Sequence, residues 1–241
     1  MKKRLIITID GPSGSGKSTI ARMLAKKLGY DYMDTGAMYR GIAYAYKVHE
    51  ESSGNTSVPA IESTREDHRE LLSSKLSGLL EGLDIRFEFG EDTKVLLNGK
   101  DISKEIRSPD ISLLASALSQ HKIIREHLYR IQREIGKEGG VVLEGRDTGS
   151  VVFPNAQIKI YLDADTGERA RRRHLELISK GKAETFTKVK EDMVQRDLND
   201  SERDIAPLVI PENGIRVDTT GLSIPDVLNR ILQHIPSEGT A

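Results

Sequence analysis

The stretch LIITIDGPSGSGKSTI, residues 5–20, decides the fold of this chain. Its apolar start is typical of a buried strand, and a helical pattern follows the glycine-rich turn. The spacing of Gly11, Gly16, Lys17 and Ser18 matches the phosphate-binding loop, in which glycines let several backbone N–H groups point at one anion. We therefore predict a strand, a phosphate loop and a helix whose amino end faces a nucleotide.

Two side chains of this loop have predicted roles of their own. Lys17 would reach the outer phosphates of the nucleotide, and the Ser18 hydroxyl would bind the Mg²⁺ that bridges them. A glycine-rich turn without a ligand is the alternative, since Gly and Ser also occur in ordinary turns. The predicted nucleotide-binding residues are Gly11, Pro12, Ser13, Gly14, Ser15, Gly16, Lys17, Ser18 and Thr19.

Composition limits the classes of function. The 241 residues suffice for one large or two small domains, and the absence of cysteine excludes disulfides and thiolate metal sites. Lys and Arg number 36 against 37 Asp and Glu, so no global basic field would attract nucleic acid. The apolar run near the amino terminus is too short to span a membrane, and we expect a cytoplasmic protein with no membrane partner.

Strand and helix patterns alternate along the chain. This alternation predicts an α/β fold, a five-stranded parallel sheet flanked by helices, with strands near 5–9, 30–33, 141–143, 158–162 and 215–217. Two alternating stretches, 83–89 and 94–97, predict a small antiparallel insert, and 109–136 reads as one long helix. Ligands of such sheets bind beyond the carboxyl ends of the strands.

Polar residues follow the second predicted strand at that edge. Thr35 could cap the next helix or meet a ligand, and the alternatives are evenly balanced. Tyr39 and Arg40 fall one turn further on and could face the same pocket. Arg107 taken alone reads as a solvated surface charge.

A second charged group follows the strand at 141–143. Glu144 precedes Gly145, and Arg146 and Asp147 follow it, at a strand terminus where charges are costly unless they meet a ligand or each other. We favour phosphate and base recognition over a purely structural ion pair.

Arginines also occur in the predicted helices 167–179 and 187–200. Four of them lie at 169, 171, 172 and 173, and at least one should point toward the site, although a charge run usually marks a solvated face. Arg196 and Arg203 are seven positions apart and would share a helical face if the helix continues. These segments together predict a lid that bears arginines.

The residues favour direct phosphoryl transfer to a second substrate. The chain lacks the Cys and His clusters of a metal hydrolase, and no Ser, His and Asp set is spaced persuasively. A kinase for a non-nucleotide metabolite shares the loop and sheet. A GTPase switch should carry an Asn-Lys-x-Asp motif, which is absent, and a nucleic-acid-binding ATPase is disfavoured by balanced charge and few aromatics.

Five motifs, in order, closely resemble the bacterial cytidylate kinase family. They are GPSGSGKST (11–19), DTGAMYR (34–40), EIRSPD (105–110), EGRDTGSVVFPNA (144–156) and RDLNDSERDIAPL (196–208). The resemblance covers nearly the whole chain and implies ATP and Mg²⁺ as cofactors, with CMP or dCMP as the small-molecule acceptor. Glu144 stands where some members have Asp, and Ser18 where some have Gly; both Glu144 and Asp163 are left open as metal ligands.

The resemblance also implies residue roles and an organisation. One P-loop kinase domain, 1–241, would contain a monophosphate-binding segment at 37–107 and a lid at 167–205, and we expect a monomer. The implied catalytic residues are Lys17, Arg146, Arg172 and Arg173. The implied substrate-binding residues are Thr35, Tyr39, Arg40, Arg107, Arg146, Asp147, Arg196, Asp200 and Arg203.

Overall fold

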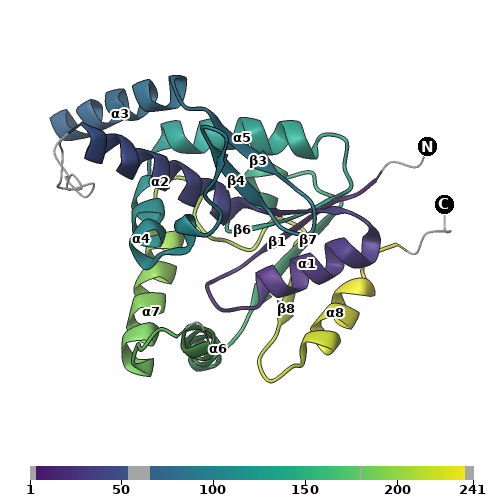
Figure 1. Ribbon diagram of the computed structural model, residues 1–241. Coiled ribbons are helices and arrows are strands. Elements are labelled where there is room, and N and C mark those ends of the chain that lie inside the picture. Colours follow the sequence, from purple (N-terminus) through teal and green to yellow (C-terminus); the bar gives the residue numbers. More distant parts are fainter. Residues whose placement is uncertain (1–3, 54–65, 180, 237–241) are drawn as a thin grey trace. The chain divides into compact units, whose positions relative to one another are not determined.

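The computed structural model describes residues 4–53, 66–179 and 181–236 (Figure 1). None of the helices in these ranges is both long enough and apolar enough to cross a lipid bilayer. In chain order the elements are β1 (Ile6–Asp10), α1 (Lys17–Leu28), β2 (Asp31–Asp34), α2 (Thr35–Ser52), α3 (Glu66–Glu81), β3 (Ile85–Glu88), β4 (Lys94–Leu97), β5 (Lys100–Asp101), η1 (Glu105–Arg107), α4 (Pro109–Leu118), α5 (Lys122–Gly136), β6 (Val141–Gly145), η2 (Thr148–Val152), β7 (Ile158–Asp163), α6 (Thr166–Ser179), α7 (Phe186–Glu202), β8 (Ile215–Asp218) and α8 (Ile224–Leu232).

The predicted five-stranded parallel sheet is confirmed. Its strand order is β2-β6-β1-β7-β8, and β1 pairs in parallel with β6 on one side and β7 on the other. β7 pairs with β8 in the same direction. Since β1 is the central strand, the loop that follows it starts in the middle of the carboxyl edge of the sheet, where ligands of parallel sheets bind.

Two compact units make up the chain. The first comprises Met1–Met33 with Gly136–Ala241, and the second comprises Asp34–Ile135. The phosphate loop and the predicted lid at 167–205 belong to the first unit, and the predicted monophosphate-binding segment at 37–107 belongs to the second. Each unit is described below by itself.

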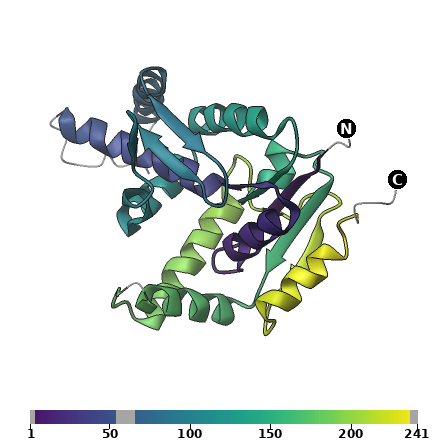
Figure 2. The same ribbon diagram turned by 45° about the vertical axis from the view of Figure 1, so that its right-hand side comes forward.

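Apolar residues of the first unit form one core around β1. Ile7 and Ile9 of β1 are fully buried, and they cluster with Leu24 of α1 and Ile231 of α8. Figure 2 shows α1 and α8 side by side along the sheet. A smaller cluster, centred on Ala170 and Met193, joins α6 to α7. The buried faces of α1 and α8 stabilise the strand that carries the phosphate loop.

The antiparallel insert in the second unit has three strands rather than the two predicted. β3, β4 and β5 pair in that order, and β5 is only two residues long, too short to show a periodic pattern. α2 packs onto this sheet at Gly41, where an added Cβ would lie 2.8 Å from Val95 Cγ1 and 2.9 Å from Ile85 Cδ1. Glycine at this position lets the helix approach the insert closely.

The single helix predicted over 109–136 is wrong, because the chain breaks between α4 and α5. Arg125 is only 1% exposed, and its Nε donates to the Ser119 carbonyl at 2.5 Å while its Nη1 donates to the Tyr129 hydroxyl at 2.8 Å. Ser119 also donates from Oγ to the Ser116 carbonyl at 2.7 Å. In a continuous helix the Ser119 carbonyl would accept a backbone N–H of the same helix. At the break it is available to accept from the buried guanidinium of Arg125.

Candidate active site

The backbone of the phosphate loop has the shape that an anion site requires. Gly14 and Gly16 have φ values of 74° and 94°, a region that residues with a Cβ avoid. A Cβ added to Gly11 would lie 2.0 Å from the Leu162 carbonyl oxygen of β7. Gly16 is the N-cap of α1 and has no side-chain cap, so the first N–H groups of the helix can bind an anion.

Lys17 lies at the start of α1 and is only 6% exposed. Its Nζ donates to the Pro12 carbonyl of the loop at 2.6 Å. Burial, followed by the positive charges of Arg146 and Arg196, lowers the pKa of Lys17 to about 7, although Glu144 acts in the opposite direction. A negative ligand in the loop would therefore favour the protonated amine strongly.

Glu144, left open by the sequence, lies beside the predicted Mg²⁺ ligand Ser18. The Ser18 hydroxyl donates to Glu144 Oε2 at 2.8 Å, and the Tyr32 hydroxyl donates to Glu144 Oε1. Asp163 instead pairs with Arg216 at 2.7 Å. The described residues contain no group of three or more His, Cys, Asp or Glu side chains suited to a metal. A hydroxyl and one carboxylate fit Mg²⁺, which takes most of its ligands from phosphates and water at such sites.

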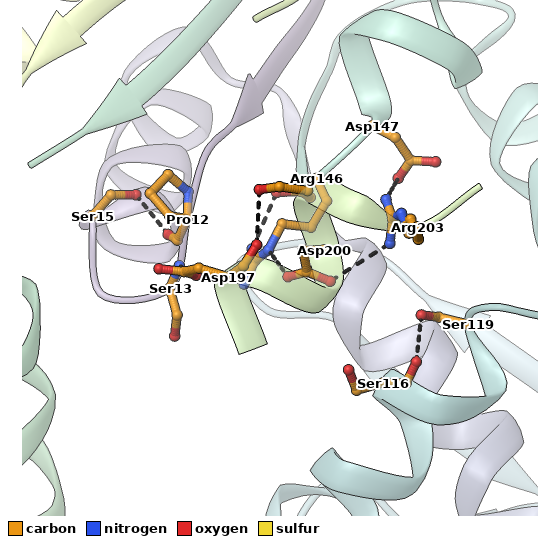
Figure 3. Close-up of polar contacts among 12 residues, drawn as sticks. Pro12, Ser13, Ser15, Ser116, Ser119, Arg146, Asp147, Asp197, Asp200 and Arg203 are labelled. Atoms are coloured by element: carbon orange, nitrogen blue, oxygen red, sulfur yellow. Dashed lines mark hydrogen bonds and ion pairs between the residues drawn. The ribbon is translucent and has the colours of Figure 1, made fainter. Parts of the chain in front are cut away.

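The predicted acceptor residues of the first unit form a network of ion pairs (Figure 3). Arg146 Nε donates to Asp200 Oδ2 at 2.8 Å. Arg203 lies between two carboxylates, with Nη1 3.6 Å from Asp200 Oδ1 and Nη2 3.8 Å from Asp147 Oδ1. Burial alone would raise the pKa of Asp200, but Arg146 and Arg196 hold it below its usual value. Arg146 and Arg203 thus share the carboxylate of Asp200, and Arg196 lies within electrostatic reach of it.

Arg203 reaches this network without the helical spacing expected for it. The helix that bears Arg196 ends at Glu202, and Arg203 is its C-cap in extended backbone conformation. Its Nε donates to the Ala206 carbonyl at 2.6 Å. The expectation that both arginines share a face of one continuous helix is therefore wrong, and the turn after α7 orients Arg203 instead.

Asp10, the last residue of β1, was missed by sequence reasoning as a site residue. Its Oδ1 accepts from the backbone N–H of Thr148 at 3.0 Å and from Thr148 Oγ1 at 2.7 Å, and its Oδ2 accepts from Gly149 N–H at 2.7 Å. Burial raises the pKa of Asp10 above its usual value, and these hydrogen bonds offset only part of the rise. The carboxylate therefore fixes the segment that follows Arg146 and Asp147. A charged residue between a buried strand and a glycine was the available signal.

The arginines of α6 separate into two groups. Arg172 donates to Thr219 Oγ1 at 2.9 Å, and the single proton of that hydroxyl lies between two acceptors, the Asp163 carbonyl at 3.1 Å and the Ser15 carbonyl of the loop at 3.3 Å. Arg169, which sequence reasoning did not select, donates from Nη1 to the Ser13 carbonyl at 3.0 Å. Arg173 pairs with Glu176 of its own helix at 2.7 Å. The arginines at 169 and 172 thus contact the loop or its neighbour, and Arg173 has a local partner.

In the second unit the predicted residues gather at the start of α2. Asp34, not Thr35, caps this helix by accepting from Ala37 N–H at 2.9 Å, so the capping interpretation of Thr35 is wrong. Asp34 also pairs with Arg40 at 2.9 Å. Burial alone would raise the pKa of Asp34, but Arg40 and, more weakly, Arg107 hold it below its usual value. Arg107 therefore lies within electrostatic reach of this helix start.

Tyr39 of the same helix contacts the buried Arg125. Arg125 Nη1 donates to the Tyr39 hydroxyl at 3.4 Å, and its guanidinium carbon lies 5.6 Å from the centre of the Tyr39 ring. The structure thus brings Arg40 and Arg107 near Asp34 and fixes the ring of Tyr39 against α5.

Comparisons with known proteins agree with the motifs. A family model described as cytidylate kinase matches residues 7–237. A protein from Bacillus cytotoxicus named cytidylate kinase is 42% identical over 233 residues, which cover 96% of this chain and 96% of that protein. One of the same name from Bacillus cereus strain B4264 is 42% identical over 236 residues, 98% of this chain and 97% of that protein.

A solved structure of an uncharacterized protein from Eubacterium ventriosum shares the fold. It is 13% identical, covers 97% of this chain and 98% of its own, and superposes with a TM-score of 0.51. At this identity the likeness concerns the fold alone.

Proposed function

The chain belongs to the cytidylate kinase family, and we propose that the residues described above bind the two nucleotides of its reaction. The enzyme transfers the γ-phosphoryl group of ATP to CMP or dCMP, and the products are ADP and CDP or dCDP. The observation that carries the assignment of residues is the network of Arg146, Asp200 and Arg203, because the positive charge of Arg146 lies within electrostatic reach of Lys17 in the phosphate loop.

On the donor side, residues 11–19 bind ATP. The uncapped N–H groups at the start of α1 bind the phosphates of ATP. Lys17 gives up its hydrogen bond to the Pro12 carbonyl and reaches the outer phosphates of ATP. Ser18 would hold Mg²⁺ through its hydroxyl oxygen. Glu144 accepts the hydrogen bond of that hydroxyl and would thereby orient it. When bound, the metal neutralises charge on the phosphate oxygens.

On the acceptor side, the guanidinium groups of the Arg146 network fit the phosphate of CMP. Arg146 and Arg203 present N–H groups that match phosphate oxygens, and the carboxylates of Asp147 and Asp200 can accept from the sugar hydroxyls. Arg196 completes this set. The family resemblance supports the further assignment of Thr35, Tyr39, Arg40 and Arg107, in the second unit, as acceptor residues.

Catalysis then rests on charge and alignment rather than on a base. Phosphoryl transfer develops charge on the equatorial oxygens, and fixed cations stabilise it in a site from which water is excluded. Lys17 supplies one such cation. Arg172 donates to Thr219, and the Thr219 hydroxyl lies 3.3 Å from the Ser15 carbonyl of the loop. Arg173 remains a proposal from the family resemblance, and it would have to exchange Glu176 for the nucleotide.

An acceptor panel tests this function. We expect ADP release from ATP to be fastest with CMP and dCMP, because the chain belongs to the cytidylate kinase family. UMP should be weaker, and AMP, GMP and shikimate should stay near the rate without acceptor. The measurement is coupled ADP release with each acceptor in turn at equal concentration. Shikimate turnover comparable to that of CMP would refute a nucleotide acceptor.

ATP binding should take up a proton at Lys17. With a pKa of about 7 the free amine is mostly neutral at pH 8, and the triphosphate raises its pKa, so the protein gains a proton on binding. We therefore expect ATP binding to take up a substantial fraction of a proton at pH 8 and much less at pH 6, where Lys17 is already mostly charged.

Calorimetry of Mg²⁺·ATP binding in two buffers of different ionisation enthalpy measures this proton uptake. Lys17→Ala is the control, and it should show no uptake at either pH. Equal uptake by the wild type and this variant would assign the proton to another group.

A further inference from the structure

Side chains of α6 and α7 form hydrogen bonds to the backbone of the phosphate loop. Asp197 of α7 accepts the Ser13 backbone N–H at 3.2 Å, and Arg169 of α6 donates to the Ser13 carbonyl at 3.0 Å. Arg169 and Asp197 also form an ion pair with each other. Figure 3 shows Asp197 beside Ser13. We call these three residues the Ser13 clasp. Both backbone groups of one loop residue are thus bound by a single ion pair.

The next residue of the loop packs against the same two helices. A Cβ added to Gly14 would lie 2.7 Å from the Arg169 carbonyl oxygen of α6 and 2.9 Å from Met193 Cε of α7. Met193 and Asp197 are one helical turn apart, so they share a face of α7. The tip of the loop therefore contacts α6 and α7 by both polar and apolar groups.

Arg169 is well suited to fix the loop rather than to meet substrate. It is 7% exposed, and its other donors bind the Ala164 carbonyl at 3.0 Å and Thr166 Oγ1 at 3.1 Å, both at the start of α6. These contacts tie the guanidinium to the end of β7. A side chain so fully bonded loses little further freedom when ATP arrives.

We propose that Arg169 and Asp197 are positioning residues that hold the Ser13 and Gly14 part of the phosphate loop in the conformation that binds ATP. A loop with many glycines is flexible by itself, and ordering it only at the moment of binding would cost conformational entropy. The clasp orders two of its residues in advance. The inference rests on the proposed role of residues 11–19 as the ATP site, and it adds two residues outside that motif.

Two conservative variants test the clasp. Asp197→Asn keeps an acceptor for Ser13 but removes the charge that pairs with Arg169, and Arg169→Lys keeps the charge but lacks the fork that binds two acceptors at once. We expect either variant to weaken binding of Mg²⁺·AMP-PNP, a non-hydrolysable ATP analogue, and to raise the KM for ATP, each about tenfold. For Arg169→Lys the KM for CMP at saturating ATP should stay within about twofold, whereas general loss of structure would change both KM values. Asp197 also acts on the charge of Arg146, so the KM for CMP is compared in Arg169→Lys alone.

Matched controls come from the same two helices. Asp192→Asn removes an exposed carboxylate of α7 that pairs with Lys188, and Arg171→Lys alters an exposed arginine of α6 that pairs with Glu168. Both should bind the analogue as the wild type does. The double variant Arg169→Lys with Asp197→Asn should cost no more than the larger single change, because the two residues act as one unit.

The outcomes separate this proposal from the others. Analogue affinities of both clasp variants within twofold of wild type would overturn it. Tighter binding would also overturn it, since Asp197 would then compete with the nucleotide for the loop. A failed acceptor panel would refute the CMP site while leaving these analogue affinities as predicted, so the two failures are distinguishable.

Discussion

Lys17→Ala should lower the turnover number by about 10³-fold, because it removes a fixed positive charge at the transferring phosphoryl group. The amine is pre-placed in the loop, bonded to the Pro12 carbonyl at 2.6 Å, and its burial excludes most competing water. The KM for CMP should change little, since Lys17 is assigned to the donor phosphates. Coupled ADP release at saturating substrates measures the effect.

The fold should survive this substitution. Burial disfavours the charged amine, which is why its pKa falls to about 7, so the folded state loses little when the charge is removed. Urea unfolding should therefore give a midpoint close to that of the wild type. Lys27→Ala, an exposed position in the last turn of the same helix, is the matched control and should keep full activity. Unchanged turnover in Lys17→Ala would reject the role.

Arg146→Lys should lower kcat/KM for CMP by about 10²-fold or more while leaving the affinity for ATP analogues within about twofold. The lysine keeps one positive charge near Asp200 but cannot donate to two phosphate oxygens in the plane of a guanidinium. Its effect should appear both in the KM for CMP and in kcat, since Arg146 is assigned to substrate binding and to catalysis. Initial rates over a range of CMP concentrations separate the two.

The control for Arg146→Lys is Arg216→Lys. Arg216 pairs with Asp163 across β8 and β7 and is exposed, so its replacement changes an ion pair that has no assigned role in the reaction. It should retain the activity of the wild type. If both variants lose activity equally, the loss comes from the protein as a whole, and the assignment of Arg146 to the acceptor phosphate fails.

Much of the fold was predictable because its signals are local. The strands of the sheet are short apolar runs, and glycines mark the loop between β1 and α1. The break between α4 and α5 was missed because each helix buries one apolar face, although the polar run from Ser119 to Lys122 interrupts the apolar spacing between them. At this break the buried guanidinium of Arg125 binds the Ser119 carbonyl, a contact that depends on tertiary packing.

Arg146, Asp147, Asp200 and Arg203 were named from two separate motifs, but which of their side chains contact one another was not predictable. Lys17 and Ser18 follow directly from the spacing of one motif. The contacts of Asp10, Arg169 and Asp197 join distant parts of the chain: Ser13 and Asp197 are 184 positions apart, and Asp10 and Gly149 are 139 apart. No local pattern encodes such pairs. The arginine of α6 that touches the loop lies in the first turn after β7, and nearness to the strand end was the usable signal.

The carboxylate of Asp10 has a consequence for protein engineering. Asp10 is the last residue of β1, the strand that precedes the phosphate loop. All three hydrogen bonds that its carboxylate accepts come from the segment that follows Arg146 and Asp147. A designer who transplants the glycine-rich loop into another scaffold without η2 would leave this buried acid with no donors. The phosphate loop and the segment that carries Arg146 and Asp147 would have to be transplanted together.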